Sequence, residues 1–348
     1  MRTERILAIE SSCDETAIAI VDVSKDESGE IRSHVLASHV LSQIETHRAY
    51  GGVIPEVASR EHYEALSGLV SDCIQLSGVE EFTITRVAAT VSPGLVGGLL
   101  VGSVYAKNYA FGLGVPFSGV NHIEGHALTV GLTNCMQPPY LVLLVSGGHC
   151  QFVSVTDVGE YKLIGKTKDD SVGECFDKVA QMLGLPYPGG PSVEKLATKG
   201  DSQKYDFPKP MLHNGLDFSF SGLKTAVRQT IDSVEMIEGI KADICASFQH
   251  TVAAVFSHKL KKALKETGHK SCVVAGGVAA NKTIRMALQH VCDNENVQFI
   301  APPLKLCTDN AEMIGYTAGV RVLLGADDSK VTVKPRWPLE DMNWRSAS

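Results

Sequence analysis

The chain has 348 residues, of which 44% are hydrophobic and 20% are charged. This composition is typical of a globular protein and excludes a disordered one, and the length predicts about two domains. The net charge of -7 argues against a protein that holds nucleic acid by overall electrostatic attraction alone. It leaves a nucleic-acid substrate open, because a local basic patch can exist within an acidic total.

Several features bear on the compartment in which the protein works. No apolar run reaches the roughly 18 residues that a membrane-spanning helix needs. An apolar strand begins at Ile6, which leaves no room for a signal peptide after Met1. The nine cysteines form no CxxC pair, so zinc ribbons and thioredoxin-like redox motifs find no support. We therefore expect a cytoplasmic protein, not bound to a membrane, with reduced and mostly buried thiols.

Two segments with the same pattern open two parts of the chain. Each has two apolar runs joined by a turn of small and polar residues, and each predicts a β-hairpin. Two such hairpins predict a duplicated α/β architecture. The paired runs are 6–9 and 17–21 around Glu10–Thr16, and 140–145 and 151–155 around Ser146–His149.

Later segments alternate strands and helices, as this architecture requires. The patterns predict strands at 87–91 and 271–275, and helices over 97–111 and from about residue 281 onward. Pro138 and Pro139 follow a polar stretch, so we place the division there, with halves at 1–137 and 138–348.

His122 and His126 are four residues apart in Asn121-His122-Ile123-Glu124-Gly125-His126. On a helix this spacing places both imidazoles on one face, where they can share a cation. The metalloprotease signature fails, because its glutamate directly follows the first histidine. A structural alternative is a capping box, with Asn121 as N-cap and Glu124 three residues later.

Asp309 offers a carboxylate that can complete a set of two histidines and one acid. Such a set, with open coordination positions, suits iron or another divalent metal. Asp309 also fits a helix N-cap, with Glu312 at the capping-box position. Sequence distance alone does not decide between these two interpretations.

Three glycine turns follow apolar strands, and glycine lets backbone amides approach a phosphate closely. Neither a Walker A sequence nor a complete GxGxxG is present, so P-loop and dinucleotide-binding sites lose support. Together the turns favour a nucleotide-like ligand, with Asp177 as a further polar candidate or as a helix start. They are Ser146–His149, Pro188–Pro191 and Gly276–Asn281.

Taken together, these stretches resemble the tRNA N6-adenosine threonylcarbamoyltransferase family, the TsaD proteins, formerly described as glycoprotease-like. The resemblance runs from about residue 5 to 338, with the motifs in the family's order. The matching segments are Glu10–Thr16, Tyr50–Glu56, Ser92–Leu95, Asn121–His126, Val145–His149, Phe176–Lys178, Tyr187–Pro191, Phe218–Lys224, Gly276–Asn281, Cys307–Asn310 and Arg336-Trp337.

The resemblance implies an actin-like, Hsp70-type ATPase fold, with two duplicated ribonuclease-H-like halves and a cleft between them. It also implies an acyltransferase activity: threonylcarbamoyl passes from threonylcarbamoyl-adenylate to N6 of adenosine 37, in tRNAs reading codons that begin with A, and AMP is released. The implied partners, besides tRNA and the adenylate, are a paralogous TsaB-like subunit and a small TsaE-like ATPase.

The resemblance also implies the roles of particular residues. His122, His126 and Asp309 would bind one divalent metal per subunit, taken as iron (Fe²⁺). The general base is not identified, with Asp14, Glu15 and His149 as candidates. The implied ligands of the adenylate are Val145, Ser146, Gly147, Gly148, His149, Asp177, Gly190, Glu194 and Asn281.

Three other functions remain open on sequence grounds. A sugar-kinase-like or chaperone-like ATPase has the same fold, and fold alone does not exclude it. The others are a metalloendopeptidase and a non-catalytic scaffold within a tRNA-modifying complex.

Overall fold

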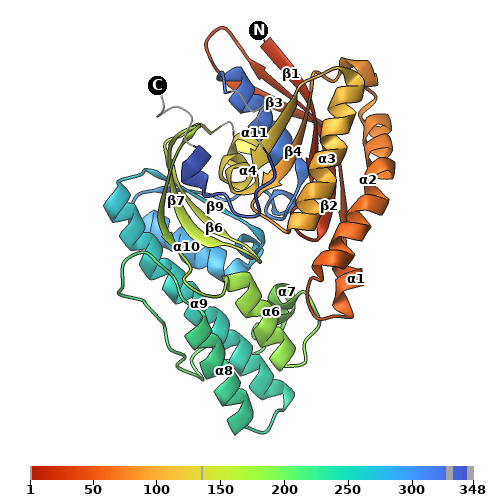
Figure 1. Ribbon diagram of the computed structural model, residues 1–348. Helices are drawn as coiled ribbons and strands as arrows, with labels where there is room; N and C mark the ends of the chain where they lie inside the picture. The colour runs from red at the N-terminus through yellow and green to blue at the C-terminus, as the bar shows by residue number, and fades with distance from the viewer. Residues whose placement is uncertain (1, 135, 327–331, 343–348) are drawn as a thin grey trace. The chain divides into compact units, whose positions relative to one another are not determined.

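A computed structural model describes residues 2–134, 136–326 and 332–342 (Figure 1). The chain forms two compact units: Met1–Gln137 with Asp157–Tyr161 and Asp309–Ser348, and Pro138–Thr156 with Lys162–Thr308. The first boundary lies where the sequence analysis divides the chain. The described residues from Asp309 onward group with the first unit, although the predicted division puts them in the second half. The outer ends of the predicted halves, Met1 and 343–348, lie outside the described residues.

The first unit is built on a five-stranded sheet in the order β3-β2-β1-β4-β5. β1 pairs antiparallel with β2 and parallel with β4, and this pairing confirms the predicted hairpin and the strand predicted at 87–91. The strands are β1 (Arg2–Glu10), β2 (Glu15–Lys25), β3 (Ile31–Ser42), β4 (Arg86–Ser92) and β5 (Phe117–Asn121).

Helices cover both faces of this sheet, so its central strands are apolar throughout rather than alternating. On β1, Ile6 and Ala8 pack in a cluster with α11, whereas Leu7 and Ile9 pack in a cluster with α2 and α3. The helices of the unit are α1 (Ile44–Arg48), α2 (Pro55–Ser77), α3 (Val96–Leu113), α4 (His122–Leu128), α5 (Val130–Asn134) and α11 (Ala311–Leu323).

The second unit repeats this arrangement. Its sheet has the order β10-β9-β6-β7-β8, in which β6 is antiparallel to β7 and parallel to β9. Read from the hairpin edge, both sheets therefore have the same topology, and the duplicated α/β architecture is confirmed. The elements are β6 (Tyr140–Val145), β7 (Cys150–Asp157), β8 (Glu160–Lys166), β9 (Ser271–Ala275), β10 (Gln298–Ile300), α6 (Val172–Met182), α7 (Gly189–Ala197), α8 (Ser221–Ser233), α9 (Glu238–Thr267) and α10 (Lys282–Asn294).

Two further expectations concern thiols and membranes. The eight described cysteines are free, seven of them buried and Cys13 partly exposed, while Cys135 lies outside the described residues. Within the described ranges, none of the helices combines the length and the apolar character that crossing a bilayer requires.

One glycine within α3, Gly98, and one just before it, Gly94, allow this part of the chain to lie directly against the turn between β1 and β2. A Cβ atom added at Gly98 would lie 2.3 Å from the carbonyl oxygen of Ser11, and one at Gly94 would lie 2.6 Å from that of Ser12. Real Cβ atoms do not approach backbone oxygens so closely. The turn is therefore held in van der Waals contact with the helix.

We expect Gly98→Ala to destabilise the protein by about 1–3 kcal/mol, because the added methyl group must displace the backbone of the turn. Gly112→Ala in the same helix is the matched control, since nothing lies within 4 Å of its added Cβ. That substitution should stabilise the protein by about 0.5–1 kcal/mol through helix propensity. Urea unfolding of the two variants measures both effects, and equal midpoints would contradict the close packing.

Candidate metal centre

The helix that carries the two histidines begins where its sequence predicts. Asn121 ends β5 and is the N-cap of α4, with its side-chain oxygen accepting from the amides of Ile123 (2.9 Å) and Glu124 (3.3 Å). Such a cap satisfies amides that have no partner within the helix. His122 is therefore the first residue of α4, and His126 lies one turn further on the same face.

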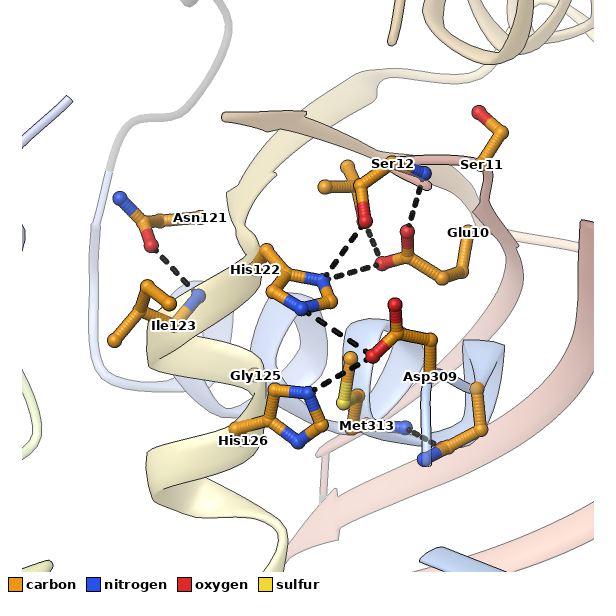
Figure 2. A network of polar contacts seen from close by, with 12 residues as sticks. Glu10, Ser11, Ser12, Asn121, His122, Ile123, Gly125, His126, Asp309 and Met313 are labelled. Carbon is orange, nitrogen blue, oxygen red and sulfur yellow. Dashed lines mark hydrogen bonds and ion pairs between the residues drawn. The ribbon is translucent and has the colours of Figure 1, made fainter. Parts of the chain in front are cut away.

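Asp309 lies just before α11, and it is not the cap of that helix. Asn310 takes this role by accepting a hydrogen bond from the amide of Met313 at 3.0 Å. The N-cap interpretation of Asp309 is therefore wrong by one residue. The carboxylate of Asp309 instead points toward the two imidazoles (Figure 2).

The three side chains converge on one point. Oδ1 of Asp309 lies 3.4 Å from Nε2 of His122 and 3.2 Å from Nε2 of His126. One ligand atom from each residue lies within 4.8 Å of the others. Both histidines are buried and Asp309 is partly exposed, so the group is open on the side of the carboxylate.

The orientation of the His122 ring is fixed from behind by Glu10. Nδ1 of His122 lies 3.1 Å from Oε2 of Glu10 and 3.2 Å from the hydroxyl oxygen of Ser12. Burial raises the pKa of Glu10, but the charge and hydrogen bond of His122 lower it by more, so the net shift is downward. An ionised Glu10 only accepts hydrogen bonds, so Nδ1 carries the hydrogen and Nε2 faces Asp309.

This geometry fits a bound cation. Without one, the lone pair of a neutral His122 would face a carboxylate oxygen, and a proton is the only other species that relieves the repulsion. Burial lowers the pKa of His122, but the charges of Asp309 and Glu10 raise it more strongly, to about 9. Buried His126 has its pKa lowered, and its Nδ1 has no hydrogen-bond partner among the described residues. Two imidazoles and one carboxylate match the ligand preference of divalent transition metals.

Two acidic residues lie in or next to the neighbouring turn, and one of them, Glu15, interacts with this centre. Burial raises the pKa of Glu15 well above its usual value, and the charges of Asp309 and Asp14 add to this shift. Asp14 itself is buried. Of the two general-base candidates of the first unit, Glu15 thus lies near enough to both Asp309 and Asp14 to interact with them.

Glu124 has a role that the sequence did not reveal. It is fully buried and accepts from Arg321 Nη1 (2.8 Å) and from the hydroxyl of Tyr161 (2.7 Å), not from the N-cap residue. The capping-box interpretation of Glu124 is therefore wrong. Its ion pair fixes the α4 helix against α11, which begins two residues after Asp309.

In the second unit, the predicted phosphate-binding turn lies between β6 and β7. The amide of Ser146 donates to the carbonyl of His149 (2.8 Å), and the amide of His149 donates to the hydroxyl of Ser146 (3.0 Å). Gly147 and Gly148 are exposed, with nothing within 4 Å of an added Cβ. The turn after Val145 is thus a closed loop with open space beside its glycines.

The other residues predicted to bind the adenylate lie in the same unit and have structural hydrogen bonds. Asp177 accepts from the amide of Gly189 (2.7 Å) at the start of α7, and Gly190 next to it has open space. Glu194 of α7 accepts from the amide of Lys282 (2.7 Å), and Asn281 caps α10. These contacts link the residues to one another, and their role toward a ligand stays a prediction.

Comparison with solved structures places this architecture in a known class. HypF of T. kodakarensis aligns with a TM-score of 0.64 at 15% identity, over 92% of this chain and 48% of that one. The ROK hexokinase of Thermus thermophilus aligns with a TM-score of 0.51 at 13% identity, over 92% of this chain and 100% of that one. At such identities the likeness shows the fold alone, which is the actin-like, Hsp70-type ATPase fold.

Comparison of sequences goes further. The profile of the family described as TsaD, tRNA N6-adenosine threonylcarbamoyltransferase, matches residues 34–316. A curated protein of that name from Sinorhizobium medicae is 50% identical over 347 residues, which cover 97% of this chain and 95% of the relative. The one from Brucella abortus (strain S19) is equally similar, over 97% and 96%. The chain belongs to the TsaD family.

We expect Glu10→Gln to weaken the binding of a divalent metal by about 10–100-fold, because the substitution removes the carboxylate that orients His122. Glu4→Gln is the matched control, since Glu4 lies in the same strand at 9% exposure and accepts hydrogen bonds from Arg2 and Thr85. Titration with Co²⁺, followed by its visible absorption, measures the affinity. Equal affinities for both variants would show that Glu10 does not orient the ligand.

Proposed function

We propose that this chain transfers threonylcarbamoyl from threonylcarbamoyl-adenylate to N6 of adenosine 37, in tRNAs reading codons that begin with A, and releases AMP. Family membership makes the chain a transferase that acts on tRNA. The observation that carries the proposal beyond membership is the convergence of His122, His126 and Asp309, the three residues that the resemblance assigns to the metal.

The reaction needs a strongly activated donor. The adenine amine is a poor nucleophile, because its lone pair is delocalised into the ring. In the donor, the carbonyl carbon is bound through oxygen to the phosphate of AMP. The N6 nitrogen forms a bond to this carbon, the carbon–oxygen bond to phosphate breaks, and the N6 proton passes to a base. Asp14, Glu15 and His149 are our candidates for that base.

His122, His126 and Asp309 would hold one divalent ion, for which we propose Fe²⁺. When bound, such an ion supplies Lewis-acid polarisation and helps to hold the donor in line for attack. Glu10 keeps Nε2 of His122 aimed at the ion, and the buried pair of Glu124 and Arg321 fixes the helix that carries both histidines.

The adenylate itself we assign to the second unit. Val145, Ser146, Gly147, Gly148 and His149 form the loop that would bind the phosphate, with the amides of Gly147 and Gly148 as donors, and open space beside these glycines supports this assignment. Asp177, Gly190, Glu194 and Asn281 would surround the nucleoside, with their backbone contacts keeping them in place. Such amide donors are typically worth about 10²–10³ in rate when they face a developing oxyanion.

Removal of the metal should abolish transfer. We expect Asp309→Ala and chelator-treated wild type each to lose at least about 100-fold in turnover, more than an outer-shell change costs. Addition of Fe²⁺ should restore the chelated wild type and not the variant. His290→Ala, at an exposed position of α10, is the control and should match wild type. Formation of modified adenosine in tRNA is measured, with partners and donor supplied.

The alternative functions predict other products when the protein is given other substrates. A kinase would form a phosphorylated sugar from ATP, and a peptidase would cleave peptides in a manner that depends on His126. A non-catalytic scaffold would leave tRNA modification intact in Asp309→Ala. Full activity of this variant at unchanged metal content would contradict the proposal.

We further propose that partner subunits help to hold the tRNA. The net charge of -7 gives the chain no general attraction for a polyanion. The proposed partners are a paralogous TsaB-like subunit and a small TsaE-like ATPase, with a separate enzyme supplying the adenylate. We place this assembly in the cytoplasm, as the sequence analysis predicts.

The purified chain alone, given donor, metal and tRNA, should not sustain multiple turnovers, and adding the partner subunits should restore them. The readout is the amount of modified tRNA formed per mole of the chain over time. Sustained turnover by the chain alone would show that this dependence is wrong.

A further inference from the structure

A buried hydrogen-bond network of the first unit lies behind the turn that follows β1. Its side chains belong to Thr16, Gln43, His47 and His62, each at most 2% exposed. The Tyr50–Glu56 motif, which the proposed function leaves without a role, is connected to this network through the amide of Ile54. Fully buried polar networks of this kind fix the groups at their ends.

The network ends on the backbone of the turn. The carbonyl of Ser12 accepts from the amide of Leu95 (2.8 Å), and the carbonyl of Asp14 accepts from the amide of Gln43 (2.9 Å). Between them, the carbonyl of Cys13 accepts from Nε2 of His62 at 3.1 Å. The carbonyl of Cys13 is therefore held by the side chain of His62, whereas the carbonyls of its two neighbours are held by backbone amides.

The partners of His62 determine its tautomer. A carbonyl only accepts, so Nε2 carries the hydrogen, and burial lowers the pKa of His62 and keeps the ring neutral. Nδ1 then accepts from the hydroxyl of Thr16 (2.7 Å) and from the amide nitrogen of Gln43 (3.3 Å).

The same assignment continues beyond Gln43. Its amide oxygen accepts from Nε2 of His47 (3.1 Å), and Nδ1 of His47 accepts from the amide of Ile54 (3.3 Å). Each donor in this series has an acceptor, in one consistent direction from Ile54 to Cys13.

The turn that His62 holds carries side chains that act on the metal centre. The hydroxyl of Ser12 lies 3.2 Å from Nδ1 of His122, and Glu15 interacts electrostatically with Asp309 and with its neighbour Asp14. On its other side the turn packs closely against α3 at Gly98. A Cβ added at this glycine would also lie 3.1 Å from the ring of His62. A shift of the Cys13 carbonyl would therefore move the residues on both sides of it.

We propose that His62 is a positioning residue of the transferase. It holds the carbonyl of Cys13 and so keeps Ser12, Asp14 and Glu15 in place beside His122 and Asp309. The catalytic consequence rests on the proposed function, whereas the effect on the turn does not.

The test compares His62→Leu, His62→Gln and Leu66→Ala. Leucine removes all three hydrogen bonds of the ring, whereas the amide of glutamine can donate to Cys13 and accept from Thr16. Leu66 is buried one turn further along α2, so its truncation perturbs the same helix without touching the network. Thr16→Val, which removes one donor to His62 and keeps the shape, is the second variant if His62→Leu does not fold.

The first readout is amide hydrogen exchange of the peptide that covers residues 11–16, and it needs no catalytic activity. His62→Leu should speed this exchange by at least about tenfold, with Thr16→Val following in the same direction and both His62→Gln and Leu66→Ala close to wild type. The second readout is transfer to tRNA in the full assembly. His62→Leu should lose about 100-fold in kcat with little change in the KM for tRNA, and glutamine should restore most of it.

Equal exchange and equal kcat in His62→Leu and Leu66→Ala would overturn the proposal, and so would failure of glutamine to restore either readout. If the wild-type assembly does not modify tRNA at all, the proposed function fails, and the exchange experiment still decides whether His62 holds the turn.

Discussion

The first unit depends on one electrostatic constraint: two imidazole nitrogens and a carboxylate oxygen face one another in a mostly buried space. Without a positive charge, the lone pair on Nε2 of a neutral His122 repels the carboxylate oxygen of Asp309. A proton on His122 can relieve this, and the pKa of that ring is raised because the charges of Asp309 and Glu10 outweigh the lowering by burial. A divalent cation satisfies all three groups at once, because each is a ligand that such ions prefer.

Much of the surrounding structure maintains this arrangement. Asn121 is the N-cap of α4, which makes His122 the first residue of that helix. Asn310 is the N-cap of α11, which leaves the carboxylate of Asp309 to face the histidines. Glu10 and Glu124 are buried carboxylates that orient the ligands from behind. Burying a charge is costly unless it is paired, so these two acids and their partners are stable only as complete networks. Their placement beside the ligands indicates that stability and site geometry depend on the same contacts.

Local patterns in the sequence predicted the local structure well, because the period of apolar residues and the turn residues act over a few positions. Both hairpins, the strand at 87–91 and the helix after Asn281 form as expected. The meeting of His126 with Asp309, 183 residues apart, follows from no local pattern, and only the family resemblance indicated it. Glu10, Glu124 and His62 were missed as positioning residues because their partners come from distant elements. An acidic residue at the end of an apolar strand, as at Glu10, is the one local signal that pointed in that direction.

The duplicated topology gives the two equivalent hairpin turns different properties. The turn after β1 is rich in acids, and its carbonyls are tied to α3, to Gln43 and to His62. The turn after β6 is rich in glycine, closes on itself through Ser146 and His149, and leaves open space beside Gly147 and Gly148. A rigid, acidic turn suits the support of a metal centre, whereas exposed amides beside open space suit an anion. One supersecondary unit, used twice, thus forms two turns with different surroundings, and the difference lies in which groups satisfy the backbone of the turn.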